Sequence, residues 1–229
     1  MNSTNLINSA KNTIDNLVDS AQKHIAYIGT GAGLLVLLAG GWYGYRYMGI
    51  QKEQAAHTIL ADCMNQFDQA SQGKASWTDV ATMCQAGYEK FKNTKVAPYI
   101  QAVQVDALLA EQKQQEALDL LNVMLSQIGS SSPLYPLYAL KQALLKLDMT
   151  DAALHESGLQ ELEKLAADTT NIYNDAAQFY VGFYYQTHGN AGKAKEVWTN
   201  LVAINDAVTD EQARSPWASM AQEKLNGLS

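Results

Sequence analysis

From residue 49 to the C-terminus, apolar residues recur every three or four positions, which is the period of an amphipathic α-helix. Turn-forming residues interrupt this pattern repeatedly, and Ser76 to Asp79 has the order of an N-terminal capping box. The chain contains only four Pro, and no pair of segments alternates as strands do. We therefore expect an all-α domain over residues 49–229, with helices near 51–72, 77–93, 98–112, 114–128, 134–147, 150–167, 172–187, 190–204 and 216–226.

These predicted helices form successive hairpins of roughly 35 to 40 residues, a period typical of helical solenoids. The last complete hairpin has the small and aromatic positions of a tetratricopeptide repeat, namely Gly182, Tyr185, Gly189, Ala194 and Trp198. Small residues are needed where the two helices cross, and the large rings fill the space between neighbouring hairpins. Earlier hairpins fit this spacing less well, because Ala153 is followed four positions later by Ser157. The sequence thus predicts a tetratricopeptide-like solenoid.

A different pattern precedes this domain. Residues Ile25 to Tyr45 are uncharged and mainly apolar, and a helix of that length spans about 30 Å, the thickness of a bilayer core. Aromatic residues that suit the headgroup region gather at its end, namely Trp42, Tyr43, Tyr45 and Tyr47. A cleaved signal would have a shorter apolar core and a basic start, and a phosphate-binding loop would carry a Lys. We therefore predict an uncleaved transmembrane anchor at residues 24–48.

Four glycines of the predicted anchor share one helical face, because Gly29, Gly33, Gly40 and Gly44 follow one another at four, seven and four residues. Such a face lets another transmembrane helix approach closely, although glycine is also generally common in membrane helices. Residues 1–23 alternate with helical periodicity between an apolar and a polar face. This N-terminal tail is predicted to be an amphipathic helix that lies on the membrane or packs on a partner.

Charge narrows the possible partners. The formal net charge of −7 lies entirely after residue 45, because the preceding segment has two Lys and two Asp. Such a domain is unsuited to nucleic acid or anionic lipid. The four His lie in separate predicted elements without metal-ligand spacing, and no nucleophile motif occurs. We expect no enzyme, no catalytic residues, no metal and no cofactor.

Aromatic residues are dense between residues 173 and 185. One buried stripe does not have room for all of these rings, so some are expected at a surface that binds a peptide or a partner protein. Tyr173, Tyr180 and Tyr184 are the candidates. Ordinary core packing is the alternative explanation for these rings.

The two cysteines, Cys63 and Cys84, are equidistant from the turn at Gly73 to Ala75. Residues equidistant from the turn of an antiparallel hairpin lie at the same height, and both belong to apolar stripes. Facing small residues bring Cα atoms within the roughly 7 Å that a disulfide needs. We predict a Cys63–Cys84 disulfide. The alternative is two reduced core cysteines, as buried cysteines often are, and a cytosolic location would favour it.

The whole layout resembles the YfgM-type ancillary subunit of the bacterial SecYEG translocon. The matching stretches are Gly41 to Tyr47, Gly189 to Trp198 and the terminal Lys224 to Ser229. The resemblance implies a protein of the bacterial inner membrane with a short cytoplasmic tail, one anchor in the lipid bilayer and a periplasmic tetratricopeptide-like domain. It also implies membrane-protein partners, namely the translocon and a membrane-anchored chaperone of the prolyl-isomerase type, together with exported polypeptides.

Two functional hypotheses follow. The first is an interaction scaffold or chaperone accessory beside the export translocon. The second is a structural subunit of another inner-membrane assembly, such as a secretion or division complex, which would use the glycine face and the N-terminal helix as contacts. Basic residues close to the anchor are balanced on its two sides, so charge does not decide the orientation. We expect a cytoplasmic N-terminus because the resemblance implies it.

Overall fold

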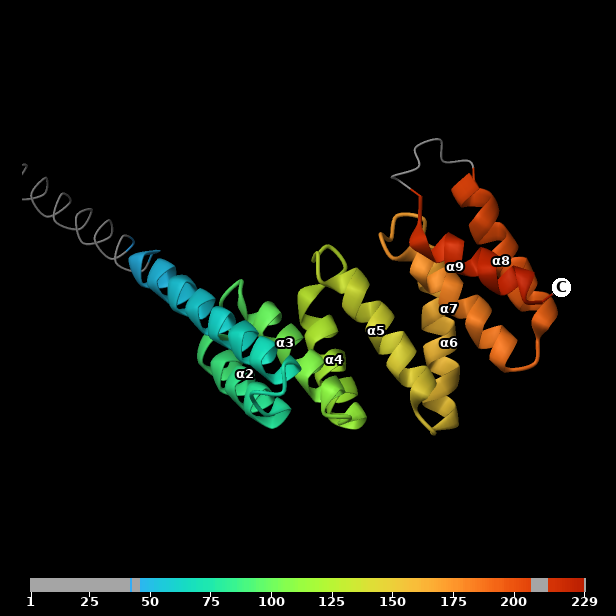
Figure 1. The fold of residues 1–229 in the computed structure, drawn as a ribbon. Helices are drawn as coiled ribbons and strands as arrows, with labels where there is room; N and C mark the ends of the chain where they lie inside the picture. The colour runs from blue at the N-terminus through green and yellow to red at the C-terminus, as the bar shows by residue number, and fades with distance from the viewer. Residues whose placement is uncertain (1–41, 43–45, 207–213, 229) are drawn as a thin grey trace, which may run out of the picture. The chain divides into compact units, whose positions relative to one another are not determined.

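The computed structural model describes residues 42, 46–206 and 214–228 (Figure 1). The N-terminal tail and the glycine face at residues 29, 33, 40 and 44 lie outside these residues, as do Tyr43 and Tyr45. Within the described residues, no helix combines the length and the apolar character needed to cross a bilayer. Most of the predicted anchor at 24–48 lies outside them, so the anchor stays a prediction.

The chain divides into two compact units, Met1–Ala55 and Ala56–Ser229. In the described part of the first unit, Trp42 and Tyr47 are exposed at 67% and 62%. Both aromatic side chains therefore contact little of the chain itself, and the membrane-interface role assigned to them above stays a prediction.

The second unit is built from helices that follow the predicted ones within a few residues (Figure 1). The first of them belongs to a continuous helix at 46–71. The others are α2 (Trp77–Phe91), α3 (Ala97–Ala110), α4 (Gln114–Ile128), α5 (Tyr135–Asp148), α6 (Ala152–Ala167), α7 (Asn174–Thr187), α8 (Ala191–Asp206) and α9 (Pro216–Asn226). The described residues contain no strand, in agreement with the expected all-α fold.

Side-chain caps set several helix starts. The Ser76 hydroxyl accepts a hydrogen bond from the Thr78 N–H at the start of α2, and Asp151 and Ser215 cap α6 and α9 in the same way. Each cap satisfies an N–H that has no partner within the helix. The predicted cap at Ser76 is therefore confirmed. At the end of α7, Gly189 adopts a φ of +77°, a conformation that favours glycine and turns the chain towards α8.

Consecutive helices pack on one another throughout this unit, and α7 also contacts α9. One apolar core runs from residues 56–70 through α2, α3 and α4 to Tyr138 and Leu145 of α5. A second core joins Leu140 and Ala143 of α5 to α6 and α7. Helix α5 therefore contributes residues to both cores and links the N-terminal hairpins to the C-terminal ones.

A polar cluster connects α3 to α5. Asp106 accepts hydrogen bonds from the Tyr138 hydroxyl at 3.0 Å and from Lys141 Nζ at 2.5 Å. Burial, followed by the negative charge of Asp106, raises the pKa of Tyr138, so this hydroxyl stays protonated and donates. These hydrogen bonds therefore join the α3–α4 hairpin to the α5–α6 hairpin.

The close approach of α5 and α6 depends on Gly158, which the repeat spacing does not indicate. A Cβ on Gly158 would lie 2.8 Å from the Ala143 carbonyl oxygen and 2.8 Å from Lys146 Cβ. The same interface contains Lys146 Nζ, which donates to Glu161 Oε1 at 2.6 Å. Gly158 of α6 therefore packs directly against the backbone of α5. It directly follows Ser157, the residue that departs from the repeat pattern.

Candidate functional site

The repeat residues of the last hairpin surround one buried ring. Trp198 of α8 is fully buried, and its Nε1–H donates to the Phe179 carbonyl oxygen of α7 at 3.1 Å. A Cβ on Gly182 would lie 2.6 Å from Trp198 Cδ1, so only glycine leaves room for the indole. Ala194, one turn before Trp198, is also fully buried. These residues are structural, and they hold α7 in place.

Tyr185 connects this hairpin to the preceding one. Its hydroxyl donates to Glu163 Oε1 of α6 at 2.5 Å and accepts from Lys193 Nζ of α8. The Lys193 ammonium also lies 4.0 Å from the centroid of the Tyr185 ring, as in a cation–π contact. Burial and the hydrogen bond to Glu163 raise the pKa of Tyr185. Tyr185 therefore links three helices by both polar and ring contacts.

A hollow of about 380 Å³ opens beside this hairpin, between α5, α6 and α7. Its size falls within the roughly 300–1,000 Å³ usual for ligand pockets. Tyr180 and Tyr184 line it, and both Tyr173 and Tyr180 pack against the second core. The partner-surface role predicted for Tyr173, Tyr180 and Tyr184 stays a prediction. The lining consists of Leu144, Leu147, Asp148, His155, Tyr180, Phe183, Tyr184, Thr187 and His188.

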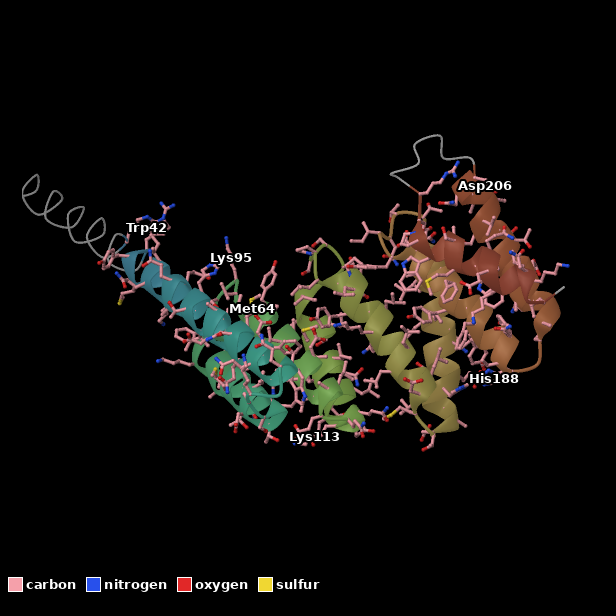
Figure 2. The ribbon with its side chains drawn as sticks, viewed as in Figure 1. Trp42, Met64, Lys95, Lys113, His188 and Asp206 are labelled. Atoms are coloured by element: carbon pink, nitrogen blue, oxygen red, sulfur yellow. The ribbon has the colours of Figure 1, made fainter. Side chains whose placement is uncertain are left out.

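Three rings form the polar side of this hollow. The rings of Tyr184 and His188 stack at 4.0 Å between centroids, and His155 of α6 lies 5.4 Å from each of them. His188 caps the C-terminus of α7, where Figure 2 labels it. The four His lie in separate predicted elements, and the sequence did not predict that His155 approaches His188. No local signal could have revealed that approach, because these residues are 33 positions apart.

The tautomer of His188 follows from its hydrogen bond. Its Nδ1 lies 2.8 Å from the Tyr184 carbonyl oxygen. A carbonyl oxygen can only accept, so Nδ1 carries the proton and Nε2 of the neutral ring is left as an acceptor. The described residues contain no group of three or more His, Cys, Asp or Glu that could hold a metal ion. The hollow is therefore an aromatic site with acceptor character.

A second hollow, of about 280 Å³, lies between α2, α3 and α4. Its lining is more polar and includes Thr78, Gln104, Lys113 and Glu116. At its edge the Thr78 hydroxyl donates to Glu111, which is also paired with Lys113 at 3.2 Å. Charges of both signs therefore lie at this hollow, and Lys113 is already paired with Glu111.

Cys63 and Cys84 face one another within the first hairpin, as the symmetry about the turn predicts. Both are free and fully buried in the structure, so the predicted disulfide is not formed there. The Cys84 thiol donates a hydrogen bond to the Cys63 sulfur, and this bond raises the pKa of Cys84 and lowers that of Cys63. Oxidation depends on the redox compartment as well as on placement, so the bridge stays a prediction.

Comparison with known proteins supports the fold. The sequence matches no family model, and it matches no curated protein. A solved structure of nearly identical tetratricopeptide-like repeats of a putative kinesin light chain from Podosopora anserina is similar, with a TM-score of 0.58 and 15% identity. The match covers 77% of this chain and 85% of that chain. A second structure with the same repeats gives a TM-score of 0.57, 15% identity and coverages of 77% and 86%. The chain therefore has a tetratricopeptide-like helical fold.

Proposed function

We propose that this protein is a membrane-anchored interaction scaffold that holds other proteins beside the export translocon and its periplasmic chaperones. The observation that carries the proposal is the aromatic hollow between α5, α6 and α7, on a tetratricopeptide-like array of hairpins. Arrays of this kind present extended surfaces on which other proteins dock. In this proposal the domain acts by binding, without catalysis and without a cofactor.

The translocon and the prolyl-isomerase-type chaperone are proposed as partners on the strength of the sequence resemblance and the predicted anchor. An anchor at residues 24–48 would keep the helical domain close to the membrane at which exported chains emerge. A net charge of −7 favours protein partners over nucleic acid and anionic lipid. We place the N-terminus in the cytoplasm and the helical domain in the periplasm of a bacterial inner membrane.

Affinity purification of the full chain from membranes in a mild detergent tests the partners. We expect translocon components and a membrane-anchored prolyl isomerase to co-purify, with mass spectrometry as the readout. A test variant carries Gly33→Leu and Gly40→Leu. These changes should weaken recovery of the transmembrane partner, while the variant itself stays in the membrane. Recovery of a secretion or division complex instead would favour the structural-subunit hypothesis.

Protease added to spheroplasts tests the orientation. The helical domain should be digested from outside, whereas intact cells should protect it. Protection of the domain in spheroplasts would place it in the cytoplasm and remove the periplasmic part of the proposal.

A further inference from the structure

We propose that the hollow between α5, α6 and α7 binds a basic side chain, best an arginine, of a partner polypeptide. This inference rests on the proposed role of the domain as a binding module and names the chemistry that the module recognises. It follows from three properties of the hollow: its rings, its charge and its hydrogen-bonding groups.

The accessible ring for a cation is that of Phe183, because the Tyr184 ring stacks on His188. Tyr180 packs against Phe179 and Trp217 and forms the wall beside it. Tyr180, Phe183 and Tyr184 all line the hollow from α7, and Phe183 is 41% exposed. Aromatic faces attract ammonium and guanidinium groups, and a guanidinium can also stack flat on a ring. The chain already uses this interaction at the edge of the hollow, where Lys224 Nζ of α9 lies 5.7 Å from the centroid of the Phe183 ring.

The charge has the matching sign. With histidine neutral, Asp148 is the single charged residue among the nine that line the hollow. Asp148 ends α5 and is exposed, so its carboxylate is accessible to a partner. A basic partner segment would be attracted to this carboxylate and an acidic one repelled by it. A bound cation would compete with Lys224 for the Phe183 ring.

The hydrogen-bonding groups complete the match. His188 donates its Nδ1 proton to the helix and offers Nε2 as an acceptor, and the Thr187 hydroxyl donates to the Phe183 and Tyr184 carbonyl oxygens. Together with Asp148, these side chains offer acceptors to an entering group. A guanidinium has five N–H donors and no acceptor, so it complements them better than an apolar, acidic or aromatic side chain does.

Binding of short peptides to the purified full chain in detergent tests the inference. The probes are an acetylated, amidated Gly-Gly-Arg-Gly-Gly peptide and the same peptide with citrulline, which keeps the shape of arginine but not its charge. Leucine and glutamate versions are further controls. Labelling the chain with ¹³C at histidine Cε1 provides the readout, because His155 and His188 border the hollow while His57 lies on the helix at 46–71.

We expect the arginine peptide to shift the His155 and His188 signals and to leave His57 unchanged. The citrulline peptide should bind about tenfold more weakly, as loss of a cation–π contact and an ion pair implies. Asp148→Asn should weaken arginine binding several-fold, whereas Asp119→Asn, the same change on α4, should not. Lys224→Gln should tighten binding about twofold, because it removes a like charge from the edge of the hollow.

Equal binding of arginine and citrulline would overturn the inference, and so would preferred binding of leucine or glutamate, or no binding at all. An unchanged affinity of both Asp148→Asn and Lys224→Gln would also overturn it. Failure of the translocon purification alongside arginine-selective binding would instead remove the proposed partners and leave the specificity of the hollow in place. The two proposals therefore fail separately.

Discussion

In the hairpin formed by residues 56–71 and α2, a glycine faces a partly buried isoleucine, whereas in the α7–α8 hairpin a glycine faces a fully buried indole. The first hairpin brings Cys63 against Cys84 and Gly87 against the side chain of Ile59. The second encloses Trp198, which is fully buried, against Gly182. Both are antiparallel helical hairpins, but they should differ in how well they accept a methyl group added at the interface glycine, Gly87 or Gly182.

The difference lies in what the neighbouring group can do. The atom nearest to a Cβ on Gly87 is Ile59 Cγ2, and this methyl moves only when χ1 changes. Ile59 is partly buried, so its side chain is less constrained than a fully buried ring. Trp198 is held by its packing and by the hydrogen bond from Nε1 to the Phe179 carbonyl oxygen, so it has no other position available. The cost of replacing a glycine in a helix–helix interface thus depends on how rigid the side chain facing it is.

Trp198→Ala should have the largest effect. Truncating a fully buried tryptophan leaves a cavity and costs about 4 kcal/mol of unfolding free energy. The change in unfolding free energy is measured by chemical denaturation of the full chain in mild detergent, monitored by circular dichroism. Trp42→Ala is the matched control, because Trp42 is 67% exposed, and it should change this free energy little. A loss below about 1 kcal/mol for Trp198→Ala would contradict the packing role of the ring.

Oxidation of the cysteine pair should stabilise the first hairpin by about 3 kcal/mol, because the bridge closes a loop of about 20 residues. Oxidised glutathione can accept the two electrons in vitro, and the same unfolding measurement before and after treatment gives the difference. Cys84→Ala cannot form the bridge, so its stability should not respond to the oxidant.

Mass spectrometry of protein from its native compartment then shows whether the bridge exists there. The expected product is the tryptic peptide at 53–74 linked to the peptide at 75–90. Free thiols in both peptides would contradict the bridge and leave two reduced core cysteines.

Gly182→Ala should destabilise the α7–α8 hairpin by about 1–2 kcal/mol. Overpacking against the indole costs about 1–3 kcal/mol, and the better helix propensity of alanine returns up to about 1 kcal/mol. The smaller ring of Trp198→Phe should relieve the overlap, so the double variant should lose less free energy than the sum of the two single changes. Additive losses would show that the indole and Gly182 do not interact.

Gly87→Ala should have the smallest effect, a loss of about 1 kcal/mol or less in unfolding free energy. The new Cβ displaces Ile59 Cγ2, which requires a change of χ1 in a β-branched side chain, and the gain in helix propensity offsets part of that cost. The same unfolding measurement compares it directly with Gly182→Ala. A loss equal to that of Gly182→Ala would show that the two hairpins do not differ in tolerance.

Much of the fold was predictable from local patterns. Apolar periodicity located the helices, and the capping residues Ser76 and Ser215 marked two of their starts. The spacing from Gly182 to Trp198 identified the last hairpin. The site was predicted less completely: the density of aromatic residues drew attention to Tyr180 and Tyr184, which line the hollow, but it did not indicate His155 or Asp148.

The sequence by itself determined what depends on neighbours along the chain: the helices, their caps, the equidistance of the two cysteines and the small residues of the last repeat. Only the tertiary structure decided that Gly158 meets the backbone of α5, that His155 approaches His188, and that Asp148 is the charged group of the hollow. Hydrogen bonds and side-chain periodicity within a helix act over a few residues. The rotation of one helix against the next depends on the packing of whole interfaces, and no local spacing encodes it.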